Sequence, residues 1–93
     1  MTATAYPPVA SLRQSPVNRK FVLYPDRIVH GHEMQPLTGV RAEVSAAASG
    51  MKGMRFLTII GPTFSWTQRS DVLNEGRCRR FAAKVNATAA TAR

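Results

Sequence analysis

Apolar and polar residues alternate in short runs through the first three quarters of the chain. Residues 21–24 are mostly β-branched or aromatic and stop at Pro25-Asp26, and residues 28–30 resume that character. Proline presets φ and aspartate accepts a local backbone hydrogen bond, so this break is typical of a tight turn. The pattern predicts a hairpin of strands 20–24 and 28–30, followed by a connection over 31–36.

Three more strands are predicted downstream. Residues 40–45 alternate with a period of two, which puts their apolar members on one face of a half-buried strand. Residues 55–60 and 63–68 are strand-like runs separated by Gly61-Pro62, a break that predicts a second hairpin. The stretch 46–53 has two glycines and no alternation, so we expect a loop there.

After Asp71 the apolar spacing changes from two to three and four. Asn74 is expected to be the N-cap of an amphipathic helix that runs to about residue 90. Gly76 weakens the first turn by about 1 kcal/mol relative to alanine, so the helix is expected to start late. The apolar face of this helix comprises Cys78, Phe81, Ala82, Val85 and Ala89.

The predicted elements give an α+β fold with a bent antiparallel sheet or open barrel of about five to seven strands and one C-terminal helix. Residues 1–18 contain three prolines and few apolar side chains. They are expected to form an extended or flexible N-terminal arm, which can pair with a sheet only at an edge. Residues 19–91 are expected to form a single domain.

Four local patterns within this order resemble the pleckstrin-homology-like domains of actinobacterial proteins. They are Tyr-Pro-Asp-Arg at 24–27, Pro-Leu-Thr-Gly-Val at 36–40, Gly61-Pro62, and Arg-Arg-Phe-Ala-Ala-Lys-Val-Asn at 79–86. The resemblance covers residues 20–90. It implies an open barrel plugged at one end by the helix through Phe81 and Val85, and lined by Phe56, Ile60, Phe64 and Trp66.

The chain departs from that family in two ways. The family has seven strands and the pattern gives about five, so the missing wall would come from the N-terminal arm, from residues 31–37 or from another subunit. Lipid-binding members usually carry a cluster of bases on the first hairpin loop. This chain offers only Arg27 there, with Arg19 and Lys20 nearby.

Charge is the strongest compositional signal. Thirteen Lys and Arg against five Asp and Glu give a net charge of +8, most of it in the C-terminal half. Arg77, Arg80 and Lys84 are spaced three and four apart, which predicts a cationic stripe along one flank of the helix. The candidate partner- or anion-binding residues are Arg69, Arg77, Arg80, Lys84, Lys52 and Arg55.

Catalytic and metal chemistry have little support in the sequence. His30 and His32 are expected to project to the same side of a strand, and a third metal ligand would have to be Glu33 or Cys78. We predict no metal site and no cofactor. Cys78, the single cysteine, is interpreted as a small core residue, and the scattered acids offer no catalytic pair.

The sequence leaves three classes of function open. The first is a non-enzymatic interaction module that binds another protein, or its own copies, through a sheet edge and the basic flank of the helix. The second is a nucleic-acid or anionic-lipid binder, and the third is a small bacteriophage protein that is a particle component or binds a host factor. A cytoplasmic location is expected, because residues 1–10 lack the features of a secretory signal and no apolar run is long enough to cross a bilayer.

Overall fold

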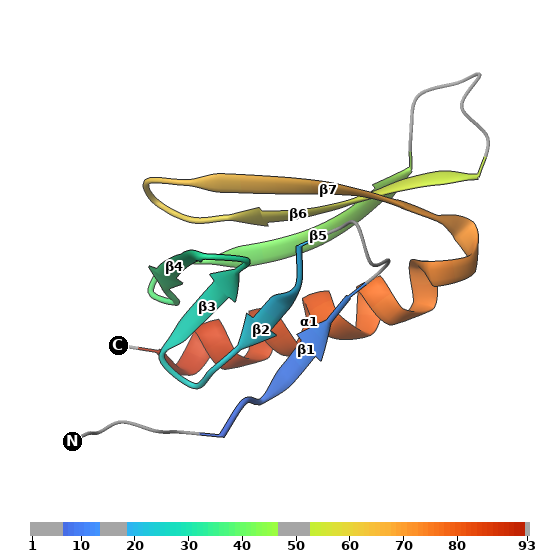
Figure 1. Ribbon diagram of the computed structural model, residues 1–93. Coiled ribbons are helices and arrows are strands. Elements are labelled where there is room, and N and C mark those ends of the chain that lie inside the picture. Colours follow the sequence, from blue (N-terminus) through green and yellow to red (C-terminus); the bar gives the residue numbers. More distant parts are fainter. Residues whose placement is uncertain (1–6, 14–18, 47–52, 93) are drawn as a thin grey trace.

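The computed structural model describes residues 7–13, 19–46 and 53–92, and within them seven strands form two antiparallel sheets (Figure 1). The first sheet has the order β1-β2-β3-β4 and the second has the order β5-β6-β7. A single turn of 3₁₀ helix, η1, leads from the second sheet into the long helix α1. The bounds are β1 (Ala10–Leu12), β2 (Phe21–Leu23), β3 (Arg27–His30), β4 (Glu33–Pro36), β5 (Arg41–Ala46), β6 (Met54–Ile60), β7 (Ser65–Asp71), η1 (Val72–Asn74) and α1 (Glu75–Thr91).

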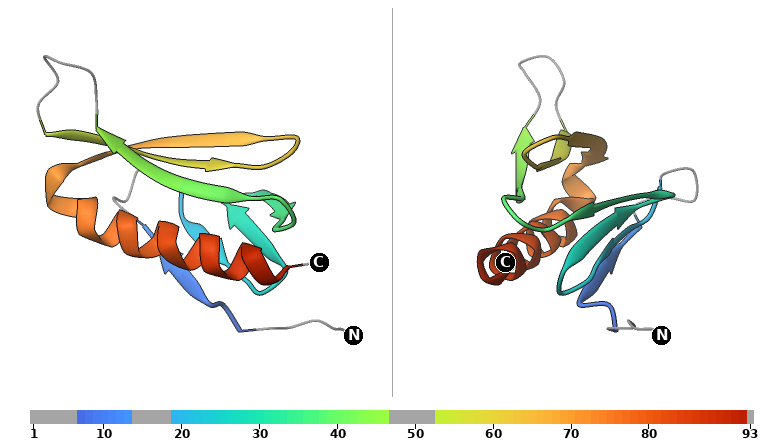
Figure 2. Two further views of the ribbon diagram at one scale, coloured as in Figure 1. Left: turned by 180° about the vertical axis from the view of Figure 1, so that it is seen from behind. Right: turned by 90° about the vertical axis from the view of Figure 1, so that its left-hand side faces the viewer.

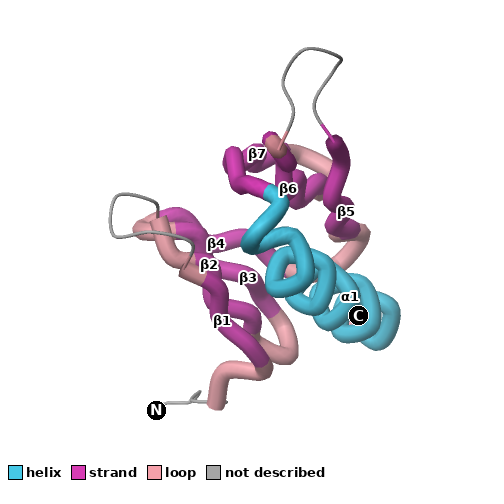
Figure 3. Tube along the Cα trace, turned by 90° about the vertical axis from the view of Figure 1, so that its right-hand side faces the viewer, coloured by secondary structure: helices cyan, strands magenta, loops and turns pink. Residues whose placement is uncertain are grey.

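The α+β class and the C-terminal helix are therefore confirmed, but the two sheets do not close into a barrel. Helix α1 contacts both β5 and β1, so that it lies beside both sheets (Figures 2 and 3). Its buried side is the predicted apolar face: Cys78, Phe81, Ala82 and Val85 are buried. The ring of Phe81 lies 5.9 Å from that of Phe21 on β2, which joins the helix to the first sheet.

One apolar core fills the space between the sheets and the helix. Its members come from both sheets, from α1 and from the connection between β4 and β5. They are Leu12, Phe21, Leu23, Ile28, Leu37, Val40, Ala42, Leu57, Ile59, Trp66, Cys78, Phe81, Ala82 and Val85.

Two strands lie where the hydrophobic pattern indicated none. β4 falls in the segment predicted to be a connection, so that prediction was wrong; its residues are mostly exposed and have no apolar alternation to reveal a strand. β1 falls in the proline-containing segment 1–18, and it pairs with β2 at the edge of the sheet, with Leu12 buried. The two extra strands thus come from the N-terminal arm and from residues 31–37, two of the three places from which the missing strands were expected.

The inward face of β6 was also predicted wrongly. Leu57 and Ile59 are fully buried, whereas Phe56 and Ile60 lie on the opposite side of the strand and are half-buried. Apolar residues occupy both faces of this strand, so the sequence pattern does not fix which face turns inward. Trp66 on β7 is buried as expected, and Phe64 packs against it with 4.6 Å between ring centroids.

The helix start differs in detail from the prediction. Asn74 does precede α1, but its side chain makes no capping hydrogen bond. Asp71 supplies that bond one turn earlier, because its carboxylate accepts from the Asn74 backbone N–H at 3.0 Å. The helix begins at Glu75, so Gly76 does not delay it.

Within the described part of the chain, no helix combines the length and apolar character needed to cross a membrane.

Candidate functional site

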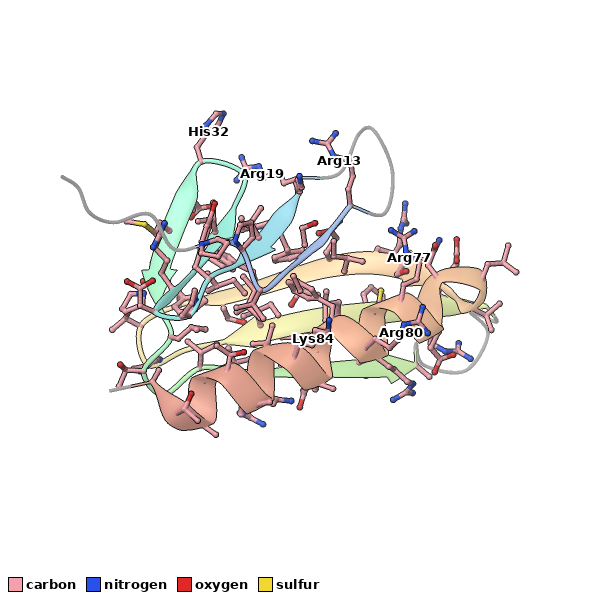
Figure 4. The ribbon with its side chains drawn as sticks, turned by 90° about the horizontal axis from the view of Figure 1, so that it is seen from below. Arg13, Arg19, His32, Arg77, Arg80 and Lys84 are labelled. Carbon is pink, nitrogen blue, oxygen red and sulfur yellow. The ribbon has the colours of Figure 1, made fainter. Side chains whose placement is uncertain are left out.

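Three of the predicted cationic residues gather on one side of α1, where the helix faces β1 (Figure 4). There the strand and the helix enclose an open groove of about 230 Å³. Its lining consists of Ala10, Ser11 and Leu12 from β1 and Arg77, Arg80, Phe81 and Lys84 from α1. We call this the β1–α1 groove.

Arg77 reaches across one end of the groove. Its guanidinium donates at 3.1 Å to the backbone carbonyl of Arg13, directly after β1, and at 3.3 Å to the Asn74 side-chain oxygen. The first of these bonds joins the helix to the strand backbone across 64 positions of sequence. Arg77 therefore both contributes charge and fixes the spacing between the two walls.

Arg80 and Lys84 have no such engagement. Among the described residues, neither side chain forms an ion pair or a hydrogen bond, and no acidic residue lines the groove. Both residues are exposed. Two cations with no counter-charge in the described part of the chain thus face a partly apolar groove, an arrangement suited to binding an anion.

Arg55 is engaged in a different contact. Its Nε donates to Glu75 at 2.9 Å, and Arg79 binds the other oxygen of the same carboxylate at 2.6 Å. Hydrogen bonds from Arg79 and Arg55 hold the pKa of Glu75 below its ordinary value. The Arg55 side chain is only 22% exposed, so this network ties β6 to the start of α1 and leaves Arg55 little freedom to meet a partner.

The two remaining candidates do not join the groove. Arg69 is exposed on the face of β7 opposite to Trp66 and Gln68, which turn toward the core. It is paired across the sheet with Phe56 on β6. Lys52 lies outside the described residues.

The histidines do not form the pair that the sequence suggested. His32 lies in the turn between β3 and β4, not on a strand, and it is exposed. His30 stacks on Phe21 with ring centroids 4.2 Å apart, and its Nδ1 is buried without a hydrogen-bond partner among the residues that the structure describes. Burial lowers the pKa of His30, the Arg19 cation adds to this effect, and Glu33 opposes it.

The residues that the structure describes contain no group of three or more His, Cys, Asp or Glu side chains able to hold a metal ion. Cys78 is fully buried on α1, as its position on the apolar face predicted. Its sulfur contacts the Ser70 hydroxyl at 3.5 Å.

Sequence reasoning missed the strand wall of the groove. Ala10–Leu12 is too short for a periodic signal, and its neighbours are prolines and polar residues. Arg13, whose backbone carbonyl accepts from Arg77 and whose side chain points away from α1 (Figure 4), was missed with it. One usable clue was present: Val9 and Leu12 are two of the few large apolar residues in the arm, and Leu12 is buried.

No protein-family model matches this chain, and no curated protein or solved structure matches it either.

Proposed function

We propose that this protein is a non-enzymatic interaction module that binds an acidic segment of a partner protein in the β1–α1 groove. The observation that carries the proposal is the placement of Arg77, Arg80 and Lys84 beside an edge strand, with no acid in the lining. Edge strands present unpaired backbone groups, and guanidinium binds carboxylates with two parallel hydrogen bonds. Together they favour a polypeptide ligand over a small molecule.

The pleckstrin-homology-like family remains our proposal for the fold. Seven described antiparallel strands and a C-terminal helix support this proposal, although they form two sheets that do not close into a barrel. The first hairpin argues against a headgroup-binding role, because Arg27 is engaged there by Asp26 at 2.9 Å and lies over the Tyr24 ring. A protein-binding role for the same fold is therefore the better-supported proposal.

Binding of nucleic acid or anionic lipid is the second candidate, and the net charge of +8 favours it. Such binding responds to total charge and falls steeply with salt. The cations of this chain are spread over several faces: Arg41 lies on β5, Arg69 on β7 and Arg80 on α1. A polyanion that binds through charge alone would use all of these faces.

Fluorescence anisotropy with three probes separates these proposals. The probes are a glutamate-rich peptide, a single-stranded oligonucleotide and vesicles that contain an anionic lipid, all at near-physiological salt. We expect the peptide to bind, and Arg80→Glu or Lys84→Glu to weaken that binding by about tenfold or more, because each reversal replaces an attraction with a repulsion.

Arg41→Glu is the matched control. It changes the net charge by the same amount on an exposed residue of β5, outside the groove. If Arg41→Glu and Arg80→Glu reduced the affinity for the peptide equally, binding would depend on overall charge, and the groove would be excluded as the binding site. Preferential binding of the oligonucleotide or the vesicles would favour the second candidate.

Self-association, a bacteriophage origin and a cytoplasmic location stay as proposals from the sequence. Light scattering of the purified protein tests the first of these.

A further inference from the structure

β1 offers the groove a strand edge that no other described strand pairs with. It is the first strand in the order β1-β2-β3-β4, so only one of its sides is paired with another described strand. Along a strand, backbone groups face alternate sides. The Arg13 carbonyl points to the helix side, where it accepts from Arg77, so Ser11, two residues earlier, turns its own N–H and C=O to that side as well.

The other strand edge beside the helix is partly occupied. On β5, Ala42 turns its N–H and C=O toward α1, and the Asn86 side chain bonds to both, at 2.8 and 2.9 Å. A groove of about 300 Å³ also lies between β5 and α1, but its lining includes the acidic Glu43, whereas the lining of the groove along β1 contains no acid. Ser11, unlike Ala42, has no side-chain partner among the described residues of α1.

The spacing of the cations suits an extended ligand. Arg77 and Lys84 are seven residues apart on α1, which corresponds to about 10 Å along the helix. In an extended chain, every second side chain points the same way and repeats at about 6.7 Å. Two acidic residues at alternate positions of a segment lying along β1 would therefore fit within the span of about 10 Å that the cations cover on the helix.

On these grounds we infer that the acidic segment is extended and adds a strand to β1. Its backbone bonds to the N–H and C=O of Ser11, and its alternate carboxylates pair with Arg77, Arg80 and Lys84. This inference rests on the proposed function, and it specifies the conformation and the charge pattern of the ligand. Main-chain hydrogen bonds would give affinity, and the spacing of the charges would give specificity.

Three synthetic peptides test the inference against the full chain. The first alternates glutamate and threonine, the second carries the same residues in two blocks, and the third is the alternating peptide with N-methyl groups on every second amide, prepared in both registers. We expect the alternating peptide to bind most tightly. N-methylation in the register that faces β1 should weaken binding by about three- to tenfold, roughly the contribution of one hydrogen bond.

Hydrogen exchange at the Ser11 amide gives a second, independent measurement. Saturation with the alternating peptide should slow exchange at Ser11 several-fold, while an exposed amide outside the groove, such as that of Thr67, keeps its rate. Equal affinity of the parent and both N-methylated peptides, with unchanged exchange at Ser11, would overturn strand addition. If Arg80→Glu still weakened binding in that case, the proposed function would stand. If neither N-methylation nor Arg80→Glu weakened the binding of any peptide, both strand addition and the proposed function would be excluded.

Discussion

The Asn86 side chain on α1 pairs with Ala42 on β5 as a neighbouring strand would. Its amide oxygen accepts from the Ala42 N–H at 2.8 Å, and its amide nitrogen donates to the Ala42 carbonyl at 2.9 Å. One side chain thus satisfies both outward backbone groups in the first half of an edge strand. The contact fixes the helix against the second sheet, and the position of the helix sets the width of the groove on its other side.

Replacing Asn86 should therefore loosen the helix. We expect Asn86→Ala to lower the free energy of unfolding by about 1–2 kcal/mol, because two hydrogen bonds to partly buried backbone groups are lost. Urea denaturation measures this change.

Thr91→Ala is the control for this variant. Thr91 is the exposed last residue of α1, and its hydroxyl donates to the Thr88 carbonyl of the same helix turn. Losing that solvent-exposed bond should shift the urea midpoint little, because water replaces it. Similar decreases in the free energy of unfolding of Asn86→Ala and Thr91→Ala would show that the Asn86 contact does not hold the helix.

Two glycines should respond to alanine in opposite directions. A Cβ at Gly61 would stand 2.1 Å from the Phe64 ring, which packs against Trp66. At Gly76 the nearest atom is the end of the flexible Arg80 side chain, at 3.5 Å. Gly61→Ala should destabilise the protein by about 1–3 kcal/mol through the clash, and Gly76→Ala should stabilise it by up to about 1 kcal/mol.

Thermal unfolding of the two alanine variants provides the check. A higher melting temperature for Gly61→Ala than for the parent would contradict the packing of Phe64 described above.

His30 should make stability depend on pH. Its pKa in the folded state lies below the ordinary value of 6.5, chiefly because burial disfavours the charged form. The unfolded state then binds more protons once the pH falls below about 6.5, so the free energy of unfolding should decrease from there until the folded-state pKa is reached. The lowered pKa of Glu75 decreases the free energy of unfolding further, but only below about pH 4.5.

The free energy of unfolding, measured with urea at several pH values between about 7 and about 5, isolates the contribution of His30. His30→Phe keeps a ring on Phe21 and should flatten the dependence in this range. His32→Ala, in the exposed turn, should keep the dependence of the parent. If the free energy of unfolding of His30→Phe depended on pH as strongly as that of the parent, a group other than His30 would be responsible.

The sequence predicted those elements whose signals are local. Pro25 and Gly61 mark the hairpins, and the spacing of Phe81 and Val85 gives the helix and its buried face. The same spacing brings Arg77, Arg80 and Lys84 together, because residues three and four apart share a helix face. The helix wall of the β1–α1 groove, which is half of the candidate site, was therefore predictable.

The other half depends on contacts between distant residues. β1 is a strand because Ala10–Leu12 pairs with Phe21–Leu23, and three residues have no periodicity that would reveal this. Glu75 explains why Arg55 does not join the groove, since that ion pair connects positions 20 apart in the sequence. The inward face of β6 could not be chosen either, because apolar residues stand on both of its faces.

The most direct test of the β1–α1 groove is a chemical-shift titration of the labelled protein with the alternating glutamate peptide. We expect the shifts to concentrate at residues 10–13 and 77–84, and the outer face of β7 around Arg69 to stay unchanged. Shifts centred on Arg69, or spread evenly over all exposed arginines, would show that the acidic ligand does not bind in the groove.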